Sequence, residues 1–449
     1  MGITSDEQRS SLKVALSRPR RFLPLQLLVM LSLCPGWATP LASPPSKLAG
    51  VRVTGSRNFT EAEIVRASGL AVGKEVSEVA LKEAAGRLGA TGLFAEVKYR
   101  YTTHGPDLTA EFQVSDAPKL LVCKFENFVW FTDEELRSKL RAQVPLFKGE
   151  VPPTGNQPDK LSTALEGLLK TRGIKGHVQS TPQGRIGGPV EAIQFRVEGV
   201  AILIHQVEFK GAAQVDAAAL QVAAQPLIAR DYEQSAVAAF AESDLTPLYG
   251  QRGYLRVAFG GPTARIVKTG GAGTSVAVTI AINEGPRYRL REIRWTGNSV
   301  FPASELAKSI HVASGEPVNA TQLQQDLEGV QDAYAAKGYL LAAITPKPTL
   351  DHAARSASYE LQVREGELFR MGKLEITGVE PFRAEALKKG CRLKAGDAYD
   401  KSYWKEFIRD SGRYLSVTPS GWKVDFKQSV YEAGKTVDVT IGFLPQAKQ

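Results

Sequence analysis

The fold is decided by one stretch, Glu284-Gly285-Pro286-Arg287-Tyr288-Arg289-Leu290-Arg291-Glu292-Ile293-Arg294-Trp295-Thr296-Gly297-Asn298-Ser299-Val300-Phe301. It predicts the end of one strand, a Gly-Pro break, and a new strand in which Leu290, Ile293 and Trp295 stand among charged residues. Gly297 and Asn298 end that strand, and a helical pattern begins at Pro302. This order is typical of a junction between two small modules, and such a junction should recur along the chain.

Five stretches share the spacing of this junction. Counting from Gly297, apolar residues stand four and nine positions later and two and four positions earlier. The same offsets hold from four other residues: Gly55, Asn127, Gly211 and Gly378. The repeat of about 70–86 residues is too long for a solenoid unit and fits a small domain.

Every unit continues in the same order. A first helix follows the turn, with Thr60 and Thr132 as expected N-caps. A glycine then ends a second helix, and the last strand of the following hairpin alternates between apolar and polar residues. Second helices are expected over 76–90, 158–171, 231–250, 318–336 and 398–411. We predict an α+β protein of five tandem β-α-α-β-β domains, each a three-stranded mixed sheet covered by two helices.

These patterns also place the domain boundaries. The chain of 449 residues is too long for one hydrophobic core. Short junctions at Glu284–Arg287 and Arg364–Phe369 are expected to limit bending between neighbours. The five domains are predicted at residues 48–118, 119–201, 202–286, 287–368 and 369–445.

The N-terminal segment predicts export. A basic stretch that ends in Arg20-Arg21 precedes an apolar run at 22–34, which has the length of a signal-peptide core and is too short to span a bilayer. Small residues at Ala38 and Ala42 offer cleavage sites, so residues 1–42 are expected to be a signal peptide and the start of a spacer. The net charge of +9 is partly in this segment and otherwise scattered in both signs, which argues against nucleic acid as a partner.

Several motifs resemble those of POTRA (polypeptide-transport-associated) domains: Gly338-Tyr339 after a second helix, Asn283-Glu284-Gly285-Pro286 with Tyr288, and Ile293-x-Trp295-x-Gly297-Asn298. The resemblance covers residues 48–445 and is clearest in the third and fourth units. Five such domains after a signal peptide are similar to the periplasmic arm of the outer-membrane barrel-assembly (BamA-type) family. The resemblance implies a periplasmic scaffold and chaperone, at the outer membrane, that contacts nascent outer-membrane proteins and accessory factors.

One expected feature of that family is missing from the sequence. In the family a membrane β-barrel follows the last POTRA domain, whereas only residues 444–449 follow the final strand here, and a barrel needs at least eight segments of roughly ten residues. The expected partners are unfolded outer-membrane proteins and a separate outer-membrane β-barrel protein, with this chain peripheral to the membrane. The alternative is a structural tether, in which an uncleaved signal anchor at 22–33 holds the array, as in division-type POTRA proteins.

No catalytic or cofactor-binding group stands out. The five histidines fall at unrelated offsets, Cys123 takes an inward strand position, and Cys391 lies in a loop where a reactive thiol has no supporting neighbour. The glycine-rich stretch 270–273 leads into a strand, whereas a phosphate-binding loop opens a helix. We expect no enzyme activity, no metal and no cofactor.

Binding is expected at the open edges of the sheets, where an extended client strand can pair with free N–H and C=O groups. The family places this edge at the first hairpin strand, which maps to 97–101, 177–180, 254–259, 340–345 and 414–418. The third is the first candidate because it is the longest run without proline: Tyr254, Leu255, Arg256, Val257, Ala258 and Phe259. The apolar loop Phe128-Val129-Trp130 is expected to pack against a neighbouring unit or to bind a partner.

Overall fold

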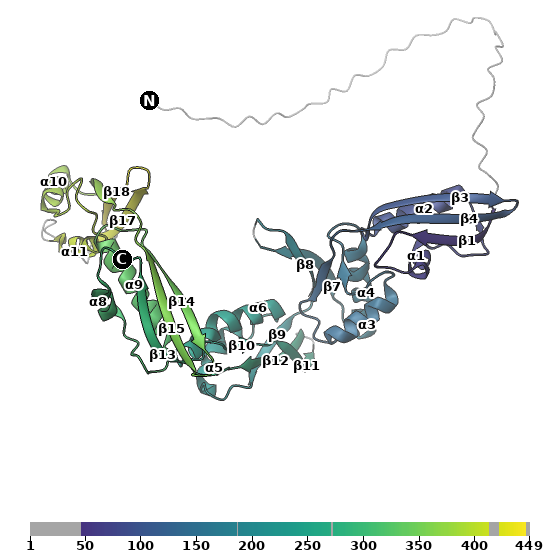
Figure 1. The fold of residues 1–449 in the computed structure, drawn as a ribbon, viewed down its shortest axis with the longest axis horizontal. Helices are drawn as coiled ribbons and strands as arrows, with labels where there is room; N and C mark the ends of the chain where they lie inside the picture. Colours follow the sequence, from purple (N-terminus) through teal and green to yellow (C-terminus); the bar gives the residue numbers. More distant parts are fainter. Residues whose placement is uncertain (1–45, 186, 271–272, 413–421, 446–449) are drawn as a thin grey trace, which may run out of the picture.

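The structure, a computed structural model, describes residues 46–185, 187–270, 273–412 and 422–445. These residues form five α+β units that follow one another in an elongated, bent row (Figure 1). Each unit has its own sheet and its own cluster of buried apolar side chains. The predicted α+β class and the repeated β-α-α-β-β units are confirmed. The expected signal peptide, residues 1–42, lies outside the described residues.

The first two units contain the same six elements. The first consists of β1 (Ser46–Thr54), α1 (Glu61–Ser68), β2 (Glu75–Val76), α2 (Glu78–Ala90), β3 (Phe94–His104) and β4 (Asp107–Asp116). The second consists of β5 (Leu121–Phe125), α3 (Asp133–Gln143), β6 (Glu150–Val151), α4 (Gln157–Thr171), β7 (His177–Gly184) and β8 (Val190–Glu198). The expected N-caps Thr60 and Thr132 are confirmed, and they form capping boxes with Glu63 and Glu135.

The remaining three units vary this plan. The third consists of β9 (Ile202–Lys210), α5 (Ala217–Ala224), η1 (Gln225–Leu227), α6 (Gln234–Phe240), η2 (Ala241–Leu245), α7 (Thr246–Gly250), β10 (Ala258–Phe259), β11 (Thr263–Gly270) and β12 (Gly273–Asn283). The fourth consists of β13 (Arg289–Thr296), α8 (Ala303–Leu306), η3 (Ala307–Ser309), α9 (Ala320–Ala336), β14 (Ala343–Asp351) and β15 (Ser356–Arg364). The fifth consists of β16 (Arg370–Thr377), α10 (Pro381–Gly390), α11 (Tyr403–Asp410), β17 (Trp422–Tyr431) and β18 (Thr436–Pro445).

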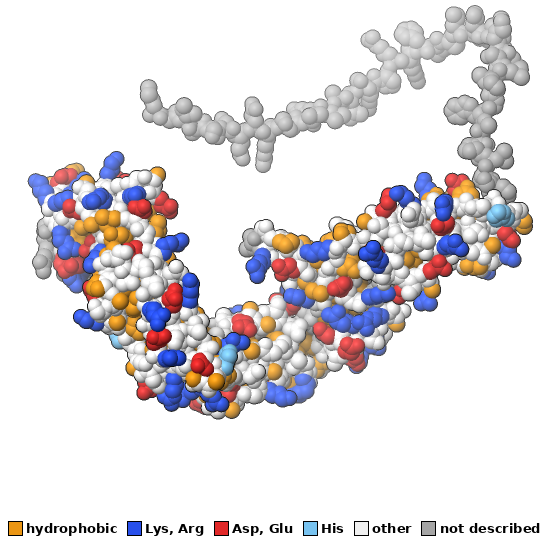
Figure 2. Space-filling model, viewed as in Figure 1, with side chains coloured by type: hydrophobic (Ala, Val, Ile, Leu, Met, Phe, Trp, Pro, Cys, Tyr) orange, Lys and Arg blue, Asp and Glu red, His pale blue; other side chains and the backbone are white. Residues whose placement is uncertain are grey.

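The strand order is the same in every unit. The first strand pairs in parallel with the last strand, which also pairs antiparallel with the hairpin strand before it. This common core is the predicted three-stranded mixed sheet. Three of the sheets add a two-residue strand, β2, β6 or β10. On the face in view in Figure 2, Lys and Arg side chains are interspersed with Asp and Glu side chains along the row.

A glycine in the left-handed region ends the first strand of four units. Its φ lies between 76° and 98° at Gly55, Gly211, Gly297 and Gly378. A Cβ atom at any of these positions would lie 2.0–2.4 Å from a carbonyl oxygen of the last strand, so no side chain fits. The second unit has Asn127 instead, whose side chain donates to Val197 O at 3.0 Å and accepts from Val197 N at 2.8 Å.

An acidic residue at the end of the last strand holds the turn that follows this glycine. In the fourth unit, Glu365 Oε1 accepts hydrogen bonds from Ser299 N at 2.6 Å and Val300 N at 2.7 Å. The first and third units use Asp116 and Glu284 in the same way. The turn before the first helix is therefore tied to the sheet at both of its ends.

Neighbouring units contact each other at the glycine that ends a second helix. Tyr288 N donates to Gly253 O at 2.8 Å between the third and fourth units, and Phe369 N donates to Gly338 O at 2.9 Å between the fourth and fifth. Both glycines have a positive φ, of 89° and 92°. This repeated contact fixes where each following first strand begins.

The fourth unit also contains a buried carboxylate. Asp326, on α9, is 5% exposed and accepts hydrogen bonds from His311 N at 2.7 Å and Gln322 Nε2 at 2.9 Å. Burial raises the pKa of Asp326, but the hydrogen bonds from His311 and Gln322 outweigh burial and lower this pKa below its usual value.

Replacing Gly297 by Ala is expected to destabilise the fourth unit by at least about 1–2 kcal/mol, the cost of the left-handed region for an L-residue, with the clash against Val363 O added. Gly315→Ala is the matched control, because Gly315 has a φ of 84° but a Cβ atom added there would meet nothing within 4 Å. Urea unfolding, with hydrogen exchange of the fourth unit, measures both. Equal losses in the two variants would show that the close contact adds nothing.

The stability of the fourth unit is expected to depend on the charge of Asp326. Because the folded pKa is lower than the unfolded one, this contribution is fully present above the unfolded pKa of about 3.8 and is lost as the pH falls through the folded pKa. Asp326→Asn should cost about 1.5–3 kcal/mol at pH 7 and flatten the decline below about pH 4. Urea unfolding from neutral to acidic pH measures this, with Asp332→Asn as the exposed control. An unchanged acid decline in Asp326→Asn would contradict the assignment.

Candidate functional site

The outermost strand on one side of each sheet is the first strand of its hairpin. Along the described residues, β3, β7, β14 and β17 each pair with a single neighbouring strand, and β11 pairs only with β12. The backbone groups on the other side of these strands face outward without a strand to pair with. The five units thus present five open edges, each on the hairpin strand that precedes the last strand.

The strand expected at Tyr254–Phe259 differs from the structure. Only Ala258 and Phe259 are a strand, β10, while Tyr254, Leu255, Arg256 and Val257 precede it in a turn. Tyr254 is buried in the third core and its hydroxyl donates to Gln214 Oε1 at 3.0 Å. Because Gly253 contacts Tyr288 of the next unit, the chain has to turn before it can join the sheet.

The hairpin edge of the third unit is therefore β10 followed by β11. Gly260 N still donates to Ala281 O at 2.8 Å, and the ladder then shifts by one residue before Thr263. In the fourth unit the expected strand 340–345 likewise starts later, at Ala343, after the contact at Gly338. The expected strands 97–101 and 177–180 lie within β3 and β7, and 414–418 lies outside the described residues.

Prolines show which backbone positions face outward. Proline has no N–H and cannot donate to the ladder, so in an edge strand its nitrogen faces the open side. β14 carries Pro346 and Pro348, opposite Leu361 and Tyr359. β7 carries Pro182 at the position that matches Pro348. These two edges therefore lack donors that an added strand would use.

β3 and β17 keep an N–H at the matching positions. These are Tyr99 and Tyr101 in β3, and Phe426 and Gln428 in β17. The pairing of β17 runs without a register shift over its 10 residues, whereas β11 has a shift at Val267. Of the five edges, β3 and β17 thus offer the most complete rows of outward donors and acceptors.

The two faces of β17 have different chemistry. The ring of Phe426 lies 6.1 Å from that of Trp404, and Phe426 and Val430, on the helix-covered face, are 36% and 43% exposed. The opposite face carries Lys423, Asp425 and Lys427. An added strand that alternates apolar and polar residues would match both faces.

The apolar loop of the second unit lies at the junction with the third unit. Phe128 is buried in the second core, Val129 packs against the third core, and Trp130 contacts both. Of the two roles expected for this loop, the structure places it in the contact between units.

The same junction contains a buried carboxylate that the sequence analysis did not identify. Glu126 is 4% exposed, and its side chain accepts a hydrogen bond from Ser235 N at 2.5 Å, in the first turn of α6. A carboxylate there is stabilised by unpaired N–H groups and by the helix dipole. Glu126 precedes Asn127, the residue that replaces the repeated glycine. This departure from the repeat is the sequence signal that could have identified Glu126 as unusual.

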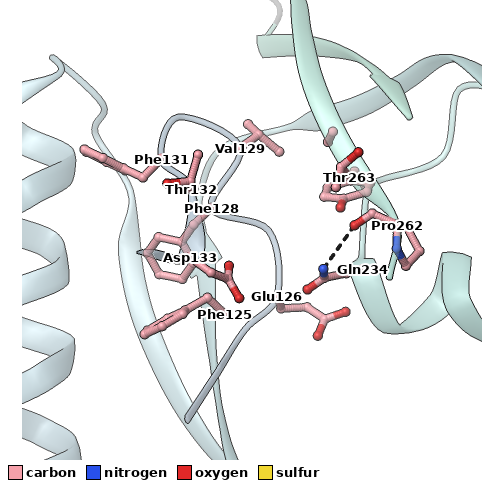
Figure 3. A pocket seen from close by; sticks show the side chains of 12 residues that line it. Phe125, Glu126, Phe128, Val129, Phe131, Thr132, Asp133, Gln234, Pro262 and Thr263 are labelled. Atoms are coloured by element: carbon pink, nitrogen blue, oxygen red, sulfur yellow. Dashed lines mark hydrogen bonds between the residues drawn. The ribbon is translucent and has the colours of Figure 1, made fainter. Parts of the chain in front are cut away.

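A cavity of about 310 Å³ lies between this loop and the start of β11 (Figure 3). Gln234 Nε2 donates to Pro262 O at 3.0 Å across one side of the cavity. Burial raises the pKa of Asp133, which lines the cavity, and Arg137 opposes this rise. Burial also raises the pKa of Tyr232, and the charges of Glu126 and Asp133 add to it. The cavity between the two units is lined by apolar and polar side chains in about equal share, and its carboxylates are Glu126 and Asp133.

The cysteines are packing residues. Cys123 and Cys391 are buried, and burial raises the pKa of the Cys123 thiol to about 12 and also raises that of Cys391. The core position expected for Cys123 is confirmed, and a thiolate is disfavoured at both sites. Among the described residues, no three His, Cys, Asp or Glu side chains converge on a possible metal site. None of the helices in the described ranges is both long and apolar enough to cross a membrane.

Comparison with known proteins gives one family match and several similar proteins. The family model described as "POTRA: Surface antigen variable number repeat" matches residues 288–366. A Treponema pallidum (strain Nichols) protein, named provisionally as an outer membrane protein assembly factor, is 25% identical over 340 residues, which are 72% of this chain and 39% of that protein. The outer membrane protein assembly factor BamA of Neisseria meningitidis serogroup B is 23% identical over 185 residues, 38% of this chain and 23% of that protein.

A solved structure of POTRA domains 3–5 of Haemophilus influenzae BamA covers 55% of this chain and 98% of its own, with 19% identity and a TM-score of 0.41. The chain spans less than two-fifths of the length of the curated relatives given above. The match includes two of the motifs from which the resemblance was predicted, Ile293-x-Trp295-x-Gly297-Asn298 and Gly338-Tyr339. Residues 288–366 match the POTRA family model, and the predicted resemblance of this chain to POTRA-domain assembly factors is confirmed.

Proposed function

We propose that this chain is a periplasmic scaffold and chaperone in outer-membrane protein assembly or transport. It holds unfolded outer-membrane protein strands by β-augmentation at its open sheet edges. The names of the relatives support the assembly role, and the uncovered hairpin strand at the edge of each sheet is the observation that carries the binding mode.

Backbone pairing suits a protein that handles many clients. An edge strand offers the same N–H and C=O groups whatever the side chains of the client, so pairing depends little on client sequence. A strand of an outer-membrane barrel alternates apolar and polar residues, which matches the two faces of β17. Several weak edges in one chain raise the effective concentration of each for a client already bound to another.

The edges contribute unequally in this proposal. β3 and β17 are the main binding edges for the client strand, because β7 and β14 have prolines at outward positions and β11 is interrupted by a register shift. The binding first expected at Tyr254–Phe259 is proposed only for Ala258 and Phe259, together with β11. A separate outer-membrane β-barrel protein is the proposed partner that receives the client, and the scaffold itself uses no catalytic group or cofactor.

Phe426→Pro is expected to weaken binding of an extended client by about three- to tenfold, because it removes one outward backbone donor. The fourth unit has Pro346 at the matching position, so the strand tolerates this change. Phe426→Ala is the matched control that removes the ring and keeps the N–H. Fluorescence anisotropy of a labelled ten-residue peptide that alternates valine with lysine or serine measures the affinity. If the proline and alanine variants bind equally, backbone pairing at β17 is not the binding mode.

The converse change is expected to open β14. Replacing Pro346 and Pro348 together by Thr restores two outward donors. Photo-cross-linking to β14 of the alternating valine peptide, made with a photoreactive residue, should rise by about threefold or more. Lys347→Thr, between the two prolines, is the control. No gain in the double variant would contradict the assignment of the prolines as blocks on this edge.

A further inference from the structure

Beyond the short pairing at its start, the first strand forms the other edge of each sheet, and a side chain of the first helix covers this part of it in three units. In the first unit, Val53 N donates to Glu61 Oε2 at 2.9 Å. In the second unit, Arg137 donates to Cys123 O at 2.9 Å, and in the third, Gln221 donates to Val207 O at 3.0 Å. The edge that faces away from the hairpin is thus occupied from within in these units.

The fourth unit has alanine at both covering positions. Glu61 stands two residues after the buried Phe59, and the matching residue after Phe301 is Ala303. Arg137 and Gln221 each follow the buried leucine of the first helix, and Ala307 follows Leu306. In the described part of the chain, no side chain covers the outward backbone groups of Ile293 and Trp295 in the way seen in the first three units.

A groove lies beside this uncovered strand. Its volume is about 540 Å³, and its lining includes Ile293, Trp295, Ala303, Ala307, Ile310 and Val312. Ala303 and Ala307 are exposed, and their small side chains leave the width that a bulkier residue would fill. The groove therefore combines a free strand edge with an apolar wall.

The first half of the same edge is already paired with an extended segment of the chain. Leu290 N donates to Glu316 O at 2.8 Å, Val318 N donates to Tyr288 O at 3.1 Å, and Arg289 and Pro317 form an antiparallel bridge. Ser314 Oγ then covers Arg291 O at 2.7 Å. Beyond that point Glu292–Thr296 stays open, so an incoming extended segment would continue an existing contact rather than create an isolated one.

We propose that Glu292–Thr296 and the groove beside α8 and η3 form a second strand-binding site. It takes a short extended segment of an unfolded polypeptide whose apolar side chains, at alternate positions, face Ala307 and Trp295. This inference rests on the proposed function, since it assigns the fourth unit a place for the same class of client. In this unit the hairpin edge β14 carries two prolines, and the first strand is the edge left available.

The test is to close the site with the side chain that the third unit uses. Ala307 of the fourth unit corresponds to Gln221 of the third, which donates to Val207 O. The glutamine of Ala307→Gln should donate to Ile293 O in the same way. Ala313→Gln is the matched control, because Ala313 is exposed in the same unit and does not line the groove. The full chain is mixed with the alternating valine peptide, which carries a central benzoylphenylalanine, and cross-linked residues are mapped by mass spectrometry.

Cross-links are expected at residues 292–312 in the unmodified chain and in Ala313→Gln, and about three- to tenfold fewer in Ala307→Gln, the effect of losing one backbone hydrogen bond. Cross-links to β17 should not change. Cross-links at β3 and β17 but none at 292–312 would overturn the inference and leave the proposed function standing. Equal cross-linking of 292–312 in both variants would also overturn it, and a chain that cross-links nowhere would contradict the proposed function itself.

Discussion

The close approach of one glycine to the last strand sets the plan of each unit. The first strand has to end, turn and enter a helix directly beneath a carbonyl group of the last strand, and a Cβ atom would lie within 2.4 Å of that oxygen at four such glycines. A positive φ and the lack of a side chain are both required there. In the second unit Asn127 takes the place of this glycine, and its side chain makes two hydrogen bonds with the backbone of Val197 in the last strand.

A second set of glycines links the units and determines where the open edges begin. Gly253 and Gly338 end their helices and accept a backbone hydrogen bond from the next unit, so the chain cannot join its own sheet immediately afterwards. β10 and β14 consequently start later than β3, which begins two residues after Gly92. The contact between units and the length of the open edge are thus coupled through the same few residues.

The sequence patterns predicted the features that depend on residues near one another in the chain. Alternation along the last strands and the glycine offsets were enough for the α+β class, the repeat and the Thr60 and Thr132 caps. The start of the strand near Tyr254 was missed because it depends on Tyr288 in another unit. The covering of first strands by Arg137 and Gln221 was missed for a related reason, since a side chain 14 residues from its acceptor leaves no periodic signal.

Open edges invite uncontrolled pairing with other chains, and natural sheets usually close them with proline, charge or a covering group. This chain closes its edges unevenly. Proline blocks outward positions in β7 and β14, and side chains cover the first strands of three units. Within the described residues, β3, β17 and the end of β13 have neither a proline nor such a covering side chain, although β3 and β17 carry charged residues. If pairing had no use, the simplest sequence would place a proline or a long polar side chain at all of these positions, because neighbouring units show that the fold accepts both. Under the proposed function, the edges left open are the ones that pair with a client strand.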